Sequence, residues 1–343
     1  MEKKSTKETV VKYLEENSGT PVSGSHIAEA LGISRTAVWK AINSLKAEGY
    51  MIDASTGKGY TLRHENDIVS EAGIMKYLGG SGGENAGGAD SRSGGAKIIV
   101  RDSVTSTNDL LREMAMKGED EAPEGTMIVA SEQTKGKGRR GRSFFSPDGT
   151  GIYFSFLLRP NVEAADAGMI TTMAAVAVAE AVKKYGVSDV GIKWVNDVYV
   201  GGRKVCGILA EATTSLETGE IDSVVVGIGL NIYTPEGGFP DDIKDRAGSI
   251  LGTERADDAR NRLVAYTYEQ FFDLYRNASE KEIAERYRSM CFVIGKKITI
   301  IKGNEQRHGT AVSLDDRCHL LVRYEDGTEE SLFSGEISLR MDQ

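Results

Sequence analysis

Cysteine and histidine are scarce in this sequence, and neither occurs in a metal-binding or disulfide pattern. The three cysteines, Cys206, Cys291 and Cys318, are widely separated. An odd number at this spacing provides no disulfide framework and no CxxC metal knuckle. The four histidines are scattered as well, so paired ligands for a structural zinc site and an HExxH helix are both missing. These absences argue against secreted disulfide-rich domains and common zinc enzymes.

Long apolar runs are also missing. The N-terminus is charged throughout and has no apolar signal core. The longest run of low charge, residues 167–179, is shorter than the roughly 18 apolar residues that a bilayer span requires. We therefore expect a cytoplasmic protein with no membrane partner. With 42 Lys and Arg against 51 Asp and Glu, the net charge is −9, so any contact with nucleic acid must come from a local basic patch.

Residues 1–63 are expected to form a winged helix-turn-helix domain. Apolar residues repeat at helical spacing around residues 10–14, two further short helices follow up to residue 47, and a hairpin is expected over residues 50–62. Residues 33–63 contain five basic and two acidic side chains. The charge alone is equally consistent with a solvated helix face. The order of the elements favours DNA binding, because a helix presented in this way fits the major groove.

The rest of the chain is predicted to contain a linker and two further domains. Residues 64–96 form a connecting segment whose part 79–95 includes eight glycines. In residues 97–290, strands mix with helices over 107–117, 166–185 and about 255–290, and short turns between neighbouring strands imply antiparallel hairpins. We expect an α+β catalytic domain with a mixed sheet here. Residues 291–343 alternate as short strands and predict a small SH3-like β-barrel.

The densest local signal is the loop 135–142, in which five residues are basic and three are glycine. It matches GxGxxG and nearly matches a P-loop, but both motifs must begin a helix, and residues 143–149 are turn-like. A kinase glycine-rich loop would require partner motifs that are absent. Backbone amides combined with positive charge still suit phosphates and developing negative charge. The alternative is a solvated basic loop.

Three other segments carry polar or glycine-rich signals. Residues 106–109 begin an amphipathic helix, so they form either a plain capping box of Ser106 with Asp109 or a cluster that binds a polar head group. In the predicted hairpin 193–211, alternation places Lys204 on one face with Cys206 and Ile208, where it could pair with a carboxylate or phosphate. Two glycines inside the strand around residues 227–231 indicate close approach of a ligand or a neighbour.

Taken together and in this order, these motifs resemble the bifunctional biotin–protein ligases that also repress the biotin operon. The resemblance covers nearly the whole chain. It implies that biotin and ATP, with Mg²⁺, form biotinyl-5′-AMP, and that biotin then passes to a lysine of the biotin carboxyl carrier protein of acetyl-CoA carboxylase. It also implies a homodimer that binds operator DNA of biotin genes with biotinyl-AMP as corepressor.

The resemblance also implies roles for individual residues. Lys204 and Arg139 would act in catalysis. The expected biotin-binding residues are Ser106, Thr107, Asn108, Gln133, Lys137, Gly138, Arg139 and Lys204. The expected nucleotide-binding residues are Trp194, Asn231, Glu336 and Ser338. The expected DNA-binding residues are Ser34, Arg35, Thr36, Trp39, Lys40 and Lys58. No metal ligand is assigned.

The sequence departs from the family pattern at two positions. Val195 replaces the proline that the family usually has there, and Lys137 stands at the first arginine of the loop. Lysine keeps the charge of arginine but lacks its bidentate fork.

Three alternatives are compatible with parts of this pattern. A lipoate–protein ligase would share the catalytic fold, but the N-terminal unit and the arginine-rich loop argue against it. A biotin-sensing transcription factor without ligase activity would not need Lys204 and Arg139. A ligase whose N-terminal domain has lost its operator is also compatible with the sequence.

Overall fold

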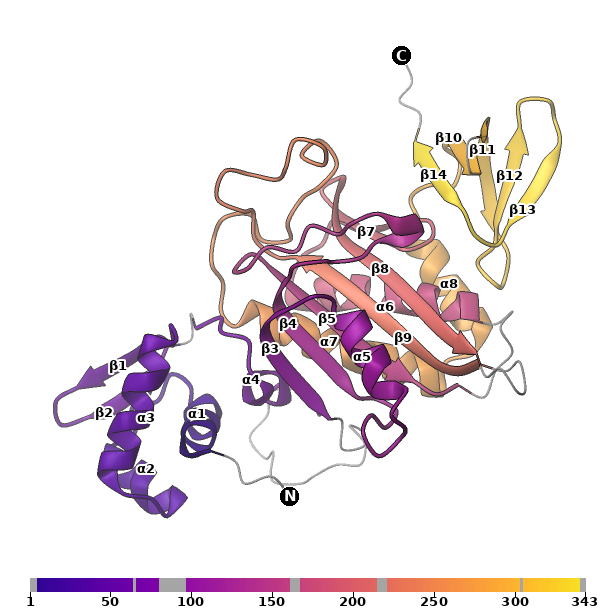
Figure 1. Ribbon diagram of the computed structural model, residues 1–343. Coiled ribbons are helices and arrows are strands. Elements are labelled where there is room, and N and C mark those ends of the chain that lie inside the picture. The colour runs from indigo at the N-terminus through magenta and orange to yellow at the C-terminus, as the bar shows by residue number, and fades with distance from the viewer. Residues whose placement is uncertain are drawn as a thin grey trace. The chain divides into compact units, whose positions relative to one another are not determined.

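The computed structural model describes residues 5–63, 66–79, 97–160, 167–214, 221–302 and 305–339. The chain divides into two compact units (Figure 1). The first comprises residues 1–92 and 254–265, and the second comprises residues 93–253 and 266–343. The predicted glycine-rich linker lies, apart from Gly79, outside the described residues. Within the described ranges, no helix is both long and apolar enough to cross a membrane.

The first unit begins with three helices and a two-stranded antiparallel wing. A serine precedes each of these helices and its Oγ accepts a backbone N–H, which satisfies a donor that the first turn would otherwise leave unpaired. The apolar faces of the helices bury a common core that includes Val10, Ile27 and Ile42. The elements are α1 (Thr6–Glu16), α2 (Gly24–Leu31), α3 (Arg35–Ala47), β1 (Ile52–Ser55), β2 (Gly59–Leu62) and the short α4 (Glu71–Met75).

Residues 254–265 complete the first unit through buried polar contacts. They include the start of α7 (Ala259–Asn277). The Arg260 guanidinium meets the Asp67 carboxylate at 3.0 Å, and both side chains are almost fully buried. The Asn261 amide accepts the backbone N–H of Ser70 and donates to the carbonyl of Ile68. A segment distant in sequence therefore fixes the chain that follows the wing.

The second unit is built on a seven-stranded mixed sheet in the order β3-β4-β5-β9-β8-β7-β6. Only β3 and β4 are parallel, and every other neighbouring pair is antiparallel. Figure 1 shows α5 in front of this sheet and α6 and α8 behind it. The strands are β3 (Ile98–Val104), β4 (Met127–Gln133), β5 (Gly151–Leu158), β6 (Val190–Lys193), β7 (Asp197–Val200), β8 (Arg203–Thr214) and β9 (Ile221–Asn231). The helices are α5 (Thr107–Ala115), η1 (Arg139–Gly141), α6 (Ala167–Tyr185), α7 and α8 (Glu280–Met290).

A second, five-stranded antiparallel sheet in the order β13-β12-β11-β10-β14 follows α8. It belongs to the same compact unit as the mixed sheet. Trp194 donates its indole N–H to the carbonyl of Cys318 at 2.9 Å, and the Tyr287 hydroxyl donates to the carbonyl of Val195 at 3.1 Å. The strands are β10 (Lys297–Lys302), β11 (Glu305–Leu314), β12 (Leu320–Tyr324), β13 (Glu329–Leu332) and β14 (Glu336–Leu339).

The predicted fold class is confirmed: a winged helix, a mixed-sheet α+β domain and a small C-terminal antiparallel β domain. Two predicted elements differ from the structure. The helix expected over about 255–290 is two helices, because Ser279 forms a capping box with Glu282 and begins α8. The strand expected over 190–200 is divided into β6 and β7, with a cis peptide bond between Trp194 and Val195.

Candidate functional site

A cavity of about 580 Å³ opens on the α5 side of the mixed sheet. It collects residues from α5, the 135–145 loop, the β6–β9 strands, the 243–247 segment and the start of β14. All but one of the residues expected to bind biotin or nucleotide line it. They are Ser106, Thr107, Asn108, Gln133, Lys137, Gly138, Arg139, Trp194, Lys204, Asn231 and Ser338. The exception is Glu336, whose side chain lies outside the described part of the structure.

A network of hydroxyl and amide groups forms one end of the cavity. Ser106 is the N-cap of α5, and its Oγ accepts the backbone N–H of Asp109, which is one of the two hydrogen bonds of the expected capping box. The backbone N–H and Oγ1 of Thr107 lie 2.9 and 3.2 Å from the Gln133 Oε1. The Ser155 Oγ lies 2.6 Å from the Asn108 Oδ1 and 2.7 Å from the Thr107 Oγ1. The segment therefore caps the helix and also presents polar groups to a ligand.

Two glycines of β9 leave room for this network. A Cβ at Gly227 would lie 2.0 Å from the Asn108 Oδ1. A Cβ at Gly229 would lie 2.4 Å from the ring of Phe144. Contacts this short do not occur between real atoms, so any larger residue would displace Asn108 or Phe144. The two glycines therefore mark the close approach of two side chains of the cavity wall, Asn108 and Phe144.

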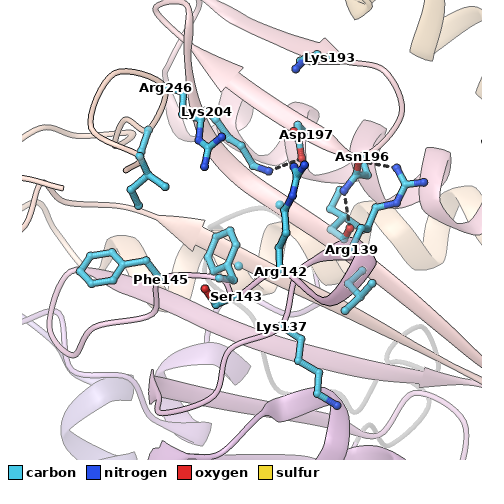
Figure 2. Close-up of a pocket in the computed structure, with 18 of the residues that line it drawn as sticks. Lys137, Arg139, Arg142, Ser143, Phe145, Lys193, Asn196, Asp197, Lys204 and Arg246 are labelled. Atoms are coloured by element: carbon cyan, nitrogen blue, oxygen red, sulfur yellow. Dashed lines mark hydrogen bonds and ion pairs between the residues drawn. The ribbon is translucent and has the colours of Figure 1, made fainter. Parts of the chain in front are cut away.

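Cationic side chains and their partners form the other end of the cavity (Figure 2). The Lys204 Nζ lies 2.6 Å from the Asp197 Oδ1. The Arg139 guanidinium donates to the Asn196 Oδ1 at 3.0 Å, and the Asn196 amide donates to the carbonyl of Ile208 at 2.9 Å. Lys137 points away from these groups in Figure 2 and meets the Asp109 Oδ1 at 2.5 Å. Positive charge thus lines the same cavity as the polar network.

The prediction that Lys204, Cys206 and Ile208 share one face is wrong. The pairing of β7 with β8 contains a β-bulge: Tyr199 is opposite Lys204, whereas Asp197 is opposite Gly207. The extra residue reverses the alternation, so Lys204 lies on the same face as Gly207. A Cβ at Gly207 would be 3.4 Å from the Lys204 Nζ, whereas Cys206 is fully buried.

The described residues around the cavity offer neither a reactive thiolate nor a preformed metal cage. Burial raises the pKa of the Cys206 thiol far above its usual range, so it stays protonated. Burial, and then the neighbouring Asp197, raise the pKa of Tyr199 to about 12. No group of three or more His, Cys, Asp and Glu side chains gathers in the described part of the chain. The cationic groups that line the cavity are suited to bind negative charge.

Several cavity residues were not singled out from the sequence. Asn196 and Asp197 stand inside a motif that was recognised, but nothing in the sequence shows that they hold Arg139 and Lys204. Arg246 comes from a segment with no local signal. It reaches the cavity because the Lys204 backbone N–H donates to the Arg246 carbonyl at 2.8 Å.

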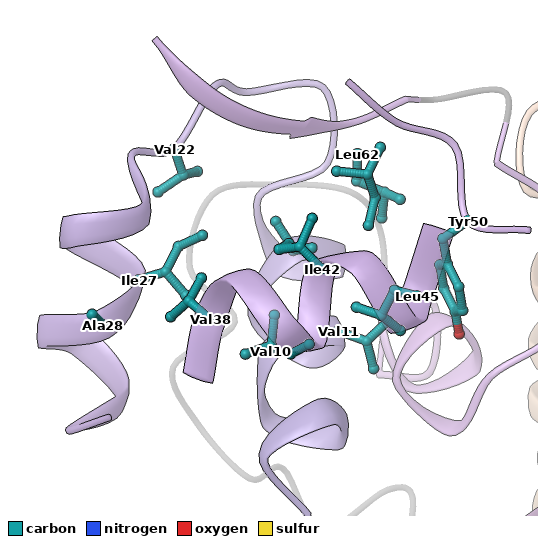
Figure 3. Packing of buried hydrophobic residues seen from close by; sticks show 13 residues of the cluster. Val10, Val11, Val22, Ile27, Ala28, Val38, Ile42, Leu45, Tyr50 and Leu62 are labelled. Carbon is teal, nitrogen blue, oxygen red and sulfur yellow. The ribbon is translucent and has the colours of Figure 1, made fainter. Parts of the chain in front are cut away.

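The expected DNA-binding residues lie on the winged helix of the first unit. Val38 and Leu45 of α3 face the apolar core that Figure 3 shows, and Trp39 on the other side is 56% exposed. Ser34 also acts as the N-cap of α3, since its Oγ accepts the backbone N–H of Ala37 at 3.1 Å. The exposed residues of the expected set are Ser34, Arg35, Thr36, Trp39, Lys40 and Lys58.

Comparisons with known proteins agree with this arrangement. The sequence profile of the biotin/lipoate A/B protein ligase family matches residues 100–231. An HTH domain profile matches residues 6–61, and the biotin protein ligase C-terminal domain profile matches residues 293–340. The order of these matches follows the order of the folded parts.

Curated relatives match nearly the whole of this chain. The chain is 33% identical to the bifunctional ligase/repressor BirA of Bacillus subtilis, over 93% of this chain and 94% of that protein. It is 28% identical to the Escherichia coli protein of the same name, over 93% of this chain and 92% of that protein. Among solved structures, the biotin protein ligase of Aquifex aeolicus in complex with biotin and ATP has a TM-score of 0.58 and 29% identity, covering 72% of this chain and 99% of that one.

Proposed function

The chain belongs to the family of bifunctional biotin ligase/repressors, and on this premise we propose that its cavity joins biotin to ATP and passes biotin on to a carrier protein. The observation that carries the proposal is a single cavity lined both by a neutral hydrogen-bonding network and by cationic side chains. The first suits a urea ring, which has both N–H donors and a carbonyl acceptor. The second suits a carboxylate beside phosphates.

In the first step, an oxygen of the biotin carboxylate attacks the α-phosphorus of ATP. The new bond joins that oxygen to phosphorus, and the bond to the departing pyrophosphate breaks. Two anions approach each other, so the barrier depends on nearby positive charge. Lys204 and Arg139 supply that charge. Lys204 is oriented by its ion pair with Asp197, and Arg139 is oriented by its hydrogen bond to Asn196. Trp194, Asn231, Glu336 and Ser338 are proposed to hold the nucleotide.

In the second step, a lysine amine of the acceptor attacks the carbonyl of biotinyl-AMP. An amide bond forms, AMP leaves with the electrons of the anhydride bond, and the amine loses a proton. No covalent bond to the enzyme is needed. We propose the biotin carboxyl carrier protein of acetyl-CoA carboxylase as the acceptor, in the cytoplasm, where the three free cysteines would stay reduced.

Mg²⁺ is proposed to enter with ATP. Mg²⁺ commonly keeps several waters and binds through substrate phosphates plus one or two carboxylates. Asp197 faces the cavity beside Lys204 and fits that limited role. When bound, the ion would offset phosphate charge during the transfer.

We further propose that the winged helix binds operator DNA of biotin genes as a homodimer, with biotinyl-AMP as corepressor. A single winged helix presents one small basic surface, and the whole chain carries −9. Specific binding therefore requires two such surfaces on two half-sites. Ser34, Arg35, Thr36, Trp39, Lys40 and Lys58 are the proposed contacts, from α3 and the wing.

Pyrophosphate release tests the ligase proposal. The purified chain with ATP and Mg²⁺ is expected to release pyrophosphate when biotin is added and not when lipoate is added. Release with lipoate alone would assign the cavity to the other branch of the matched family. Release with neither substrate would overturn the proposal.

A further inference from the structure

The Asn108 side chain is held in one orientation by groups that lie behind it. It is only 4% exposed and its amide Nδ2 lies 2.7 Å from the Glu211 Oε2 and 3.2 Å from the carbonyl of Leu209. Both N–H donors of the amide are therefore used. The Oδ1 meets the Ser155 hydroxyl at 2.6 Å, and Asn108 lines the cavity. An amide oxygen has two lone pairs, so it can accept a ligand N–H as well as this hydroxyl.

Glu211 lies near the far end of β8 and is not among the residues that line the cavity. Its second oxygen, Oε1, lies 3.3 Å from Arg112 of α5. Arg112 in turn meets the Asp109 Oδ1 at 2.5 Å, and the same oxygen meets the Lys137 Nζ. The carboxylate of Glu211 is therefore fixed by a cation on one side and by the Asn108 amide on the other.

We propose that Glu211 is a positioning residue that sets the orientation of the Asn108 amide, and thereby makes this end of the cavity select a ligand with a urea-type N–H. The inference rests on the proposed function, because it names the group of biotin that the orientation serves. Glu211 acts through Asn108 and touches neither ligand nor reacting atoms.

The alternative orientation of Asn108 shows why the carboxylate matters. With the amide turned by 180°, its oxygen would face the Glu211 carboxylate, and two acceptors would meet at hydrogen-bonding distance. Its NH₂ group would then face the cavity, where a ligand N–H would meet a donor instead of an acceptor. A carboxylate accepts only, so the observed orientation is the one that Glu211 permits. The opposite orientation would favour a ligand acceptor and would reject the urea N–H.

A set of binding measurements on the full chain tests this role. The probes are biotin and the two isomers of biotin methylated at one ureido nitrogen, measured by titration calorimetry. In the wild-type protein, one isomer should bind at least tenfold more weakly than biotin. In Glu211→Ala, biotin affinity should fall about tenfold while that isomer loses little, so that the discrimination between them collapses. A purely structural role would weaken both ligands in parallel.

Two variants make the result decisive. Glu113→Ala removes an exposed glutamate next to Arg112 and should keep the wild-type discrimination. Glu211→Gln keeps the length of the side chain but can also donate to Asn108, so it no longer enforces one orientation and should lose part of the discrimination. It replaces Glu211→Ala in the test if the alanine variant does not fold. If the biotin-to-isomer ratio is unchanged in both Glu211 variants, the inference is wrong. If the wild-type chain does not bind biotin at all, the proposed function fails instead.

Discussion

Lys204 is the residue proposed to stabilise the negative charge that develops during adenylate formation. Its ammonium lies 2.6 Å from the Asp197 carboxylate at the cationic end, and the bulge in β8 turns it toward the cavity. We expect Lys204→Ala to lower the rate of biotinyl-AMP formation by a factor corresponding to about 2.7–4 kcal/mol, because it removes a group that meets developing charge. Biotin affinity should change much less, because the ring is held at the neutral end.

Quench-flow measurement of adenylate formation and calorimetric measurement of biotin affinity separate these two effects. Lys117→Ala, which removes an exposed lysine after α5, serves as the control and should leave both quantities unchanged. An adenylation rate within threefold of the wild type would remove Lys204 from the mechanism.

Substitution of Gly227 tests the role of the polar network in biotin binding without changing any charge. An added Cβ would lie 2.0 Å from the Asn108 Oδ1, so Gly227→Ala must displace the Asn108 side chain. We expect biotin affinity to fall at least tenfold, which corresponds to about 1.4 kcal/mol. In Gly168→Ala the new methyl group meets no atom within 4 Å, and that variant should bind as the wild type does. Equal affinity of both variants would show that Asn108 does not contact the ligand.

At the level of helices and strands, most elements follow from local sequence. Strand β5 spans residues 151–158 as expected, and α6 ends at Tyr185 as expected. The errors have identifiable causes. The Ser279–Glu282 capping box that divides the last long helix is a local signal that could have been used. The bulge in β8 was not predictable, because it depends on the register of a neighbouring strand.

The candidate site also contains residues that the sequence indicates and residues that it does not. Residues 106–108 and the basic loop are recognisable as chemical motifs from the order of their residues alone. The residues that hold these motifs in place cannot be recognised in this way. Glu211, for example, is 103 positions from Asn108, and no periodicity links the two. Buried polar contacts between distant segments form only after the strands are aligned. The sequence therefore indicates the groups that face the cavity more readily than the groups behind them.

Helix α1 contributes a buried carboxylate that makes the first unit sensitive to pH. Burial, and then the nearby Asp258 carboxylate, raise the pKa of Glu15 to about 7, while Lys76 lowers it in part. Burial raises the pKa of Asp258 to about 6. The folded state thus holds protons that the unfolded state has already released. Its free energy of unfolding is highest below the unfolded pKa values and decreases as the pH rises through about 6–7.

We therefore expect Glu15→Gln to stabilise the first unit at pH 8 by about 1–3 kcal/mol and to have little effect at pH 5. Urea unfolding followed by the fluorescence of Trp39, in a Trp194→Phe background, measures this unit within the full chain. Glu16→Gln changes the exposed neighbour of Glu15 and is the matched control. A wild-type pH dependence that persists in Glu15→Gln would contradict the assigned cause.

For the whole molecule, the proposed repressor function requires that the adenylate favour the dimer. By linkage, biotinyl-AMP can shift the monomer–dimer equilibrium only by the factor by which dimerisation strengthens its own binding. We expect sedimentation velocity to show at least a tenfold lower dimer dissociation constant with biotinyl-AMP than with biotin or ATP alone. Adenylate affinity should rise by the same factor at high protein concentration. An unchanged monomer–dimer equilibrium would mean that the winged helix serves a function other than the proposed repression.

Transfer of biotin to an acceptor tests the central claim most directly. The full chain is incubated with biotin, ATP, Mg²⁺ and a biotin carboxyl carrier domain, and the acceptor is analysed by mass spectrometry. The account predicts one biotinyl group on one acceptor lysine, dependent on ATP and lost when that lysine is replaced by arginine. An acceptor that stays unmodified, while a known biotin ligase modifies the same preparation, would contradict the account.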